Sequence, residues 1–128
     1  MPPNLEPRFF GAWTAPCALG AILNAQTIPT INAKLICGAA NNQLAQDKDG
    51  AALKARGILY APDYVVNAGG IINATAEYAG ESDDFVQARV AQIPARMLDV
   101  LREAAAQDLP SNVVADTMAQ RIIASARG

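Results

Sequence analysis

The chain has 128 residues, the size of one small domain. Its 10 basic and 12 acidic residues leave a net charge of −2, which argues against a surface for nucleic acid or anionic lipid. No apolar run approaches the ~18 residues that a membrane span needs, and the first residues lack the pattern of a signal peptide. We therefore expect a cytoplasmic protein with no membrane and no nucleic-acid partner.

Missing residue types narrow the chemistry further. The chain has no histidine, which excludes Ser-His and Cys-His nucleophile systems and imidazole zinc sites. Cys17 and Cys37 are too few and too far apart for a thiolate metal site, so we expect no metal and two reduced, buried thiols. Lys34, Lys48 and Lys54 are the only lysines, and each is expected as a solvated surface charge.

The first half of the chain alternates short apolar runs with turns and helices. Residues 1–14 are expected as an irregular leader, because the first twelve hold three prolines and no periodic pattern. A short extended piece over 13–17 and a short helix over 18–24 follow, and then a linker over 27–33. The compact apolar run at 34–37 predicts a buried parallel strand.

Helices dominate the second half. We expect a helical stretch opening at Asn41 and Asn42, a helix over 49–56 closed by Gly57, and a second strand over 58–62. A helix over 71–78 follows, and Ser82 caps a long helix that Pro94 should kink. Spacings of three and four predict one buried face on that long helix, formed by Val86, Val90, Ile93, Met97, Val100 and Ala104. A last helix starts at 110–111, with Val114, Met118 and Ile122 on one side.

Alternating strands and helices predict an α/β fold with a doubly wound parallel sheet, finished by C-terminal helices. Only three strands are expected, whereas a complete dinucleotide-binding fold has about six in two halves. The pattern therefore indicates a partial, Rossmann-like half-domain.

Three segments place glycine, alanine or asparagine directly after a predicted strand: 15–20, 38–43 and 67–73. Ligands bind at the carboxyl ends of strands in such sheets, and an asparagine amide offers both a donor and an acceptor to a carboxamide such as nicotinamide. The same residues also suit ordinary turns and caps. The spacing alone indicates a ligand-binding α/β half-domain, with a nucleotide as one candidate ligand.

Four segments, 15–20, 38–44, 57–64 and 67–73, follow one another in an order and spacing that resemble a known family. From residue 15 to its end, the chain resembles the C-terminal part of the NAD-dependent leucine/valine/phenylalanine dehydrogenases of the glutamate dehydrogenase superfamily. This resemblance implies oxidative deamination of a branched-chain or aromatic L-amino acid to a 2-oxo acid.

The resemblance also implies positions for the site residues. Cys17 and Ala18 would line the cofactor cleft, and Ala40, Asn41, Asn42 and Asn67 would lie by the nicotinamide and its ribose. Asn42, Ile71 and Ala74 would form the substrate pocket, although Ile71 also suits plain helix core. Asp63 is expected to hold the turn before Asn67 through side-chain hydrogen bonds to the backbone.

Two parts of the family pattern have no counterpart in these residues. The Gly-rich phosphate loop with its acidic ribose ligand is absent, and the family's catalytic lysines and aspartate belong to a separate N-terminal domain. The resemblance therefore implies a truncated or split segment with no catalytic residue. It would be inactive alone, would meet its substrate only with the N-terminal part, and would work as a homo-oligomer or with a complementing chain. A non-catalytic dimerisation or nucleotide-binding module and a chain that does not fold independently remain alternatives.

Overall fold

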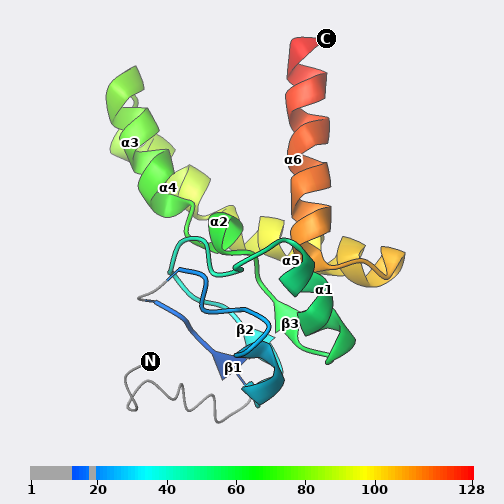
Figure 1. The fold of residues 1–128 in the computed structure, drawn as a ribbon. Coiled ribbons are helices and arrows are strands. Elements are labelled where there is room, and N and C mark those ends of the chain that lie inside the picture. The colour runs from blue at the N-terminus through cyan, green and yellow to red at the C-terminus, as the bar shows by residue number, and fades with distance from the viewer. Residues whose placement is uncertain (1–12, 18–19) are drawn as a thin grey trace.

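The computed structural model describes residues 13–17 and 20–128, which form a helix-rich mixed α/β structure around a small parallel sheet (Figure 1). The sheet has three strands in the order β1-β2-β3: β1 (Trp13–Thr14), β2 (Leu35–Ile36) and β3 (Leu59–Tyr60). Trp13 pairs with Leu35, and Leu35 pairs with Leu59. The strands expected within 13–17, 34–37 and 58–62 are thereby confirmed. The irregular leader expected over 1–14 is wrong for residues 13–14, which form β1, and its residues 1–12 lie outside the described residues.

The helices follow the sheet strands and then dominate the chain. They are the 3-10 turn η1 (Ile28–Thr30), α1 (Lys48–Ala55), α2 (Asp63–Val66), α3 (Gly69–Ala79), α4 (Asp83–Val90), α5 (Ile93–Gln107) and α6 (Ser111–Arg127). In Figure 1 the strands lie at the base of the molecule, α3 and α4 project on one side, and α6 rises on the other.

Two small hydrophobic cores hold these elements. The first lies around the sheet and includes the fully buried Leu23, Ile36 and Leu53. The second lies between α5 and α6, where Val100 and Ala104 pack with Val114 and Ala115. Alanine and valine fill the second core, so it is thin, as the alanine-rich composition suggests.

The predicted helix over 18–24 is wrong where the structure describes it, from Gly20 onward, and so is the helix expected to open at Asn41 and Asn42. These two segments pair with each other instead: Ala21 N–H donates to the Asn42 carbonyl (2.6 Å), and Leu23 N–H donates to the Gln43 carbonyl (2.9 Å). Leu23 and Leu44 form a parallel bridge. Because the backbone groups of one segment bond to the other segment, they are not available for the i to i−4 bonds of a helix.

Helix ends follow the local signals closely. The helix expected over 49–56 is confirmed as α1, and Gly57 follows it at φ +70°, a left-handed conformation that suits glycine. The Ser82 hydroxyl accepts a hydrogen bond from the Phe85 N–H (3.3 Å), so the predicted cap of α4 is confirmed.

The single long helix with one buried face is wrong. The helix is interrupted at residues 91–92, between α4 and α5. Pro94 lies in the first turn of α5, where a residue needs no N–H for a helical hydrogen bond. Val90 is exposed because α4 packs on α3, whereas Val100 and Ala104 are buried against α6. On α6 the expected apolar side is covered at Val114 and exposed at Ile122, where the helix leaves the body of the fold.

The expected burial of both thiols is also wrong for Cys17, which is exposed, while Cys37 is half-buried. Both cysteines are free. Cys17 lies just beyond the end of β1, where the chain leaves the sheet and the core no longer covers it.

Gly38 makes a close backbone contact that the sheet edge requires. A Cβ added at Gly38 would lie 2.2 Å from the Pro16 carbonyl oxygen and 2.5 Å from the Pro16 nitrogen. Both neighbours are backbone atoms, so they cannot move away as a flexible side chain would. The loops after β1 and β2 approach this closely only because residue 38 has no side chain.

We expect Gly38→Ala to destabilise the fold by about 1–3 kcal/mol, because the added methyl group overlaps backbone. Gly70→Ala is the matched control, since nothing lies within 4 Å of a Cβ added there, and helix propensity should leave its stability equal or higher by about 0.5 kcal/mol. Urea unfolding followed by circular dichroism measures both. Equal stability of the two variants would contradict the close approach.

Candidate functional site

The carboxyl ends of the three strands bring three loops together. The Ala40 N–H donates to the Pro16 carbonyl (2.9 Å), and the Cys37 N–H donates to the Thr14 carbonyl (2.9 Å), so the first two loops are bonded side by side. The third loop leads from β3 into α2. This edge is where parallel α/β sheets bind ligands.

Asn41 and Asn67, predicted as cofactor residues, meet at this edge. The Asn67 Nδ2 donates to Asn41 Oδ1 (2.6 Å) and to the Ala39 carbonyl (3.3 Å). The carbonyl can only accept, so it fixes which end of the Asn67 amide faces it. Both amide hydrogens of Asn67 are therefore used. The pair keeps one acceptor, Asn67 Oδ1, and one donor group, Asn41 Nδ2, which are the two functions that a carboxamide ligand needs.

Asn42 is held by its backbone rather than by its side chain. Its φ is +52°, a left-handed conformation that few residues other than glycine adopt, and its N–H donates to Asp63 Oδ2 (2.7 Å). The Asn42 side chain is exposed. Among the described residues, the Asn42 side chain forms no hydrogen bond with the Asn41–Asn67 pair.

Asp63 is a buried carboxylate that sequence reasoning placed incorrectly. Its side chain does not hold the turn before Asn67; it accepts from Asn42 N–H and from the Tyr60 hydroxyl (3.0 Å). The Asn67 N–H bonds the Asp63 main-chain carbonyl instead (2.8 Å). Burial and the nearby Asp63 together raise the pKa of Tyr60 far above its usual value.

Gln43 is a clamp inside the second loop that sequence reasoning missed. Its side chain is fully buried, and Nε2 donates to the carbonyls of Gly38 (2.8 Å) and Ala40 (2.9 Å). Its Oε1 has no partner among the described residues. The signal in the sequence was a glutamine directly after two asparagines in the loop that follows a predicted strand. A polar side chain that is buried in such a loop needs hydrogen-bond partners.

The other predicted cofactor residues contribute in different ways. Cys17 is exposed at the same edge, and Ala18 lies outside the described residues. Ala40 is buried, and its N–H bonds Pro16, so it shapes the loop.

The predicted substrate residues lie on two separate parts of the chain, α3 and the loop after β2. Ile71 and Ala74 lie one turn apart on α3, and both are exposed. Ile71 is 71% exposed, which rules out the alternative that it is helix core. Ile71 lines a cavity of about 330 Å³ between α3 and α4, but Ala74 and Asn42 do not. The sequence could not show this, because α3 leaves the body of the fold.

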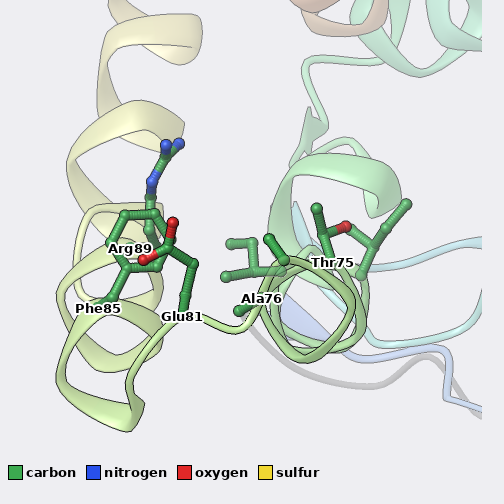
Figure 2. Close-up of a pocket in the computed structure, with 8 residues that line it drawn as sticks. Thr75, Ala76, Glu81, Phe85 and Arg89 are labelled. Carbon is green, nitrogen blue, oxygen red and sulfur yellow. The ribbon is translucent and has the colours of Figure 1, made fainter.

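Apolar side chains dominate this cavity. Figure 2 shows Phe85 and Arg89 on α4 beside Thr75 and Ala76 on α3, and the Arg89 guanidinium lies 5.0 Å from the centre of the Phe85 ring. A second apolar hollow of about 340 Å³ lies between α3, α5 and α6, and Arg89 lines it as well. The first hollow lies between α3 and α4, and the second borders the α5–α6 core, since Val100 and Ala115 line it.

Groups for acid–base or metal chemistry are scarce. In the part of the chain that the structure describes, no group of three Cys, Asp or Glu side chains is arranged to hold a metal ion. Lys54 pairs with Asp108 (2.6 Å) on the surface and lowers the pKa of Asp108 through this hydrogen bond and charge. Lys34 and Lys48 are exposed. Across residues 13–17 and 20–128, the helices are all too short or too polar to span a membrane.

Tyr64 ties the third loop to α6. Its hydroxyl donates its one proton to Asp116 Oδ1 (2.8 Å), and the Asn112 carbonyl oxygen lies 3.0 Å from the same hydroxyl. Burial, followed by the hydrogen bond and charge of Asp116, raises the pKa of Tyr64 well above its usual value.

The structure is a helix-rich α/β fold with a small parallel sheet, and its joined amides lie at the carboxyl edge of the strands, where such sheets bind ligands. The particular family follows from its relatives. The sequence profile of the Glutamate/Leucine/Phenylalanine/Valine dehydrogenase family matches residues 12–126, and the chain belongs to this family. The resemblance seen in the four motifs is thereby confirmed.

Relatives that are similar in sequence to this chain include a valine dehydrogenase and a leucine dehydrogenase. The chain is 47% identical over 113 residues to a valine dehydrogenase of Streptomyces albus, covering 88% of this chain and 31% of that protein. It is 44% identical over 109 residues to a leucine dehydrogenase of Thermoactinomyces intermedius, covering 85% of this chain and 30% of that one. The chain thus spans about a third of the length of the curated relatives it matches.

Two solved structures resemble the fold of this chain. The L-tryptophan dehydrogenase from Nostoc punctiforme superposes with a TM-score of 0.84 at 42% identity, covering 91% of this chain and 35% of that one. A glutamate dehydrogenase from Peptoniphilus asaccharolyticus shares the fold at a TM-score of 0.59 and 24% identity, covering 78% of this chain and 27% of that one.

The two raised tyrosine pKa values predict an alkaline limit to stability. Folding holds both phenol protons more tightly than the unfolded chain does, so this stabilisation is complete below the unfolded pKa of about 10 and is lost as the pH rises above it. We expect the free energy of unfolding to fall above about pH 10, and to fall less steeply in Tyr60→Phe/Tyr64→Phe. Urea titrations between pH 8 and 11 test this, and parallel curves for the two proteins would contradict it.

Proposed function

We propose that residues 15–128 form the nicotinamide-side half of the NAD-binding domain of an amino acid dehydrogenase. The observation that carries this is the Asn41–Asn67 amide pair at the carboxyl edge of the sheet, in a chain that belongs to this family. The pair leaves one donor group and one acceptor for the carboxamide of nicotinamide.

The topology supports a Rossmann-like half-domain. Its strands run parallel in consecutive order, as do the three strands of one half of a doubly wound dinucleotide fold. In that fold the second half meets the first at its leading strand, here β1. Among the described residues, β1 pairs only with β2, so its other edge is free for such a neighbour.

The residues of this chain fit the nicotinamide end of NAD, and they include no Gly-rich loop for the pyrophosphate. Asn41, Asn42 and Asn67 would hold the carboxamide and ribose, with Cys17 just beyond the end of β1. NAD when bound would accept a hydride from the substrate. The chain has no Gly-rich loop for the pyrophosphate, so we expect it to bind NAD weakly by itself.

The substrate we propose is a branched-chain or aromatic L-amino acid. Its Cα would pass a hydride to the cofactor, and water would then release a 2-oxo acid and ammonia. Valine, leucine and tryptophan dehydrogenases among the relatives support this class. Ile71 and Ala74 are apolar and exposed on α3, so they are available to an apolar substrate side chain.

Uncovered apolar faces support an interaction with more polypeptide. Tyr78 on α3 is 96% exposed, and Ile122 and Ile123 on α6 are more than half exposed. We propose that these faces contact a complementing chain segment or another copy in a homo-oligomer. The same observation favours the alternative of a non-catalytic dimerisation module. The free cysteines suit the cytoplasmic location we propose.

We propose that this segment does not supply the acid–base chemistry of the reaction by itself. Lys54 is paired with Asp108, and Lys34 and Lys48 are exposed away from the core, so we assign no general base here. A missing general base costs roughly 10²–10⁴-fold in rate. We therefore propose that the 128-residue chain has no measurable dehydrogenase activity by itself.

An exchange of segments tests this proposal. Residues 13–127 replace the matching segment of the Streptomyces albus valine dehydrogenase, and NADH formation from valine, leucine and phenylalanine is followed at 340 nm. We expect the chimera to be active and the 128-residue chain alone to be silent, because the chimera joins both walls of the cleft. A folded but inactive chimera, or activity of the chain alone, would contradict the proposal.

The amide pair is tested inside the same chimera by Asn67→Asp. A carboxylate there would face the Ala39 carbonyl and Asn41 Oδ1 without hydrogens to donate, so we expect the KM for NAD to rise at least about tenfold. Asn32→Asp, an exposed residue before β2, adds the same charge and should change the KM by less than about twofold. Equal effects of the two variants would show that charge alone, rather than the pair, matters.

A further inference from the structure

The function proposed above gives Asp63 no part. Asp63 is nevertheless buried, with 7% of the residue exposed, and both of its carboxylate oxygens accept a hydrogen bond. Oδ2 accepts from the Asn42 N–H at 2.7 Å, and Oδ1 accepts from the Tyr60 hydroxyl at 3.0 Å. Residues 42 and 63 are 21 positions apart and follow different strands. The carboxylate therefore joins the loop after β2 to the loop after β3.

This bond supports the backbone conformation of Asn42. Asn42 has a φ of +52°, in the left-handed region that asparagine adopts more readily than most residues with a Cβ. The Asn42 carbonyl is also used, because it accepts the Ala21 N–H at 2.6 Å. The Asp63 carboxylate on one side and Ala21 on the other thus fix both peptide groups of Asn42.

Asp63 is hydrogen-bonded to the backbone of both loops that carry the amide pair. Through its side chain it fixes Asn42, whose peptide neighbour is Asn41. Through its main-chain carbonyl it accepts the Asn67 N–H at 2.8 Å. Asn41 and Asn67 then meet at 2.6 Å between Oδ1 and Nδ2. The hydrogen bonds of Asp63 among the described residues include neither amide side chain, so it acts on the pair through the two backbones.

We propose that Asp63 is a positioning residue that sets the separation and direction of the Asn41 and Asn67 amides. This inference rests on the proposed function for its consequence, which is the binding of the nicotinamide carboxamide. Its structural content, the placement of two side-chain amides by a remote carboxylate, can be measured without any cofactor.

The test compares Asp63→Ala with Asp63→Asn and a matched control, Asp49→Ala. Asp49 is also buried, at 5% exposure, and its carboxylate accepts one backbone N–H, that of Gln46 at 2.9 Å, away from the amide pair. Loss of either carboxylate should lower stability, so stability alone does not distinguish them. An asparagine at 63 keeps an Oδ1 that can accept the Asn42 N–H, so it should restore the arrangement.

In the 128-residue chain, the side-chain amide resonances of Asn41 and Asn67 and the backbone amide of Asn42 are followed by proton–nitrogen NMR. We expect Asp63→Ala to shift all three, while Asp63→Asn and Asp49→Ala leave the two side-chain amides close to the original positions. Unchanged side-chain amides in Asp63→Ala, or an equal shift in Asp49→Ala, would overturn the proposal. If Asp63→Ala does not fold, Asp63→Asn decides the matter by Asn42 amide exchange: protection supports the proposal, and loss of protection in the folded variant overturns it.

In the valine dehydrogenase chimera, Asp63→Ala should raise the KM for NAD at least about tenfold, with Asp63→Asn and Asp49→Ala within about threefold of the parent. The KM for the amino acid should change less than that for NAD in Asp63→Ala, a split that general loss of stability would not produce. A displaced amide pair in the NMR spectra with an unaltered KM for NAD would leave the positioning role standing and refute the proposed cofactor contact.

Discussion

The close approach of Gly38 to Pro16 is the constraint on which the carboxyl edge of the sheet depends. The Pro16 backbone lies where a side chain at residue 38 would be, so the loops after β1 and β2 share a space that only glycine permits. Once they meet, the Ala40 N–H reaches the Pro16 carbonyl, and Gln43 closes the second loop over itself through Gly38 and Ala40. The Asn41 and Asn42 positions follow from that closed loop. The Asp63 carboxylate then ties it to the loop after β3.

The two cores of the molecule explain why its surface is uneven. Leucine and isoleucine pack around the sheet, and a thinner cluster of valine and alanine joins α5 to α6. Tyrosines connect the two regions: the Ser111 hydroxyl bonds the Tyr60 carbonyl, and the Tyr64 hydroxyl bonds Asp116 of α6. Neither core reaches the outer faces of α3, α4 and the end of α6, which keep large apolar side chains in solvent. Burying that surface against further polypeptide would add stability that the two small cores do not supply.

The residues of the site differ in how far sequence reasoning reached them. Asn41 and Asn67 were predicted at one edge and do meet there, because both follow strands that the apolar runs already marked. Ile71 and Ala74 were predicted to share a pocket with Asn42, and this stays a prediction; in the structure Ile71 lines a hollow between α3 and α4. Gln43, Tyr60 and Asp63 support the amides from inside. A polar residue in a sequence gives no sign of its partner when that partner is 21 positions away, as Asn42 is from Asp63.

By itself the sequence determined the local structure and the family. Apolar runs marked all three strands, Gly57 and Ser82 marked helix ends, and four ordered motifs identified the amino acid dehydrogenase family. These features depend on neighbouring residues, whose spacing a sequence records directly. Only the tertiary structure decided that segments 20–24 and 41–45 pair with each other instead of forming helices, and that the long helix breaks before α5. It also decided which polar groups meet, because hydrogen bonds between distant residues depend on how the loops pack at the sheet edge.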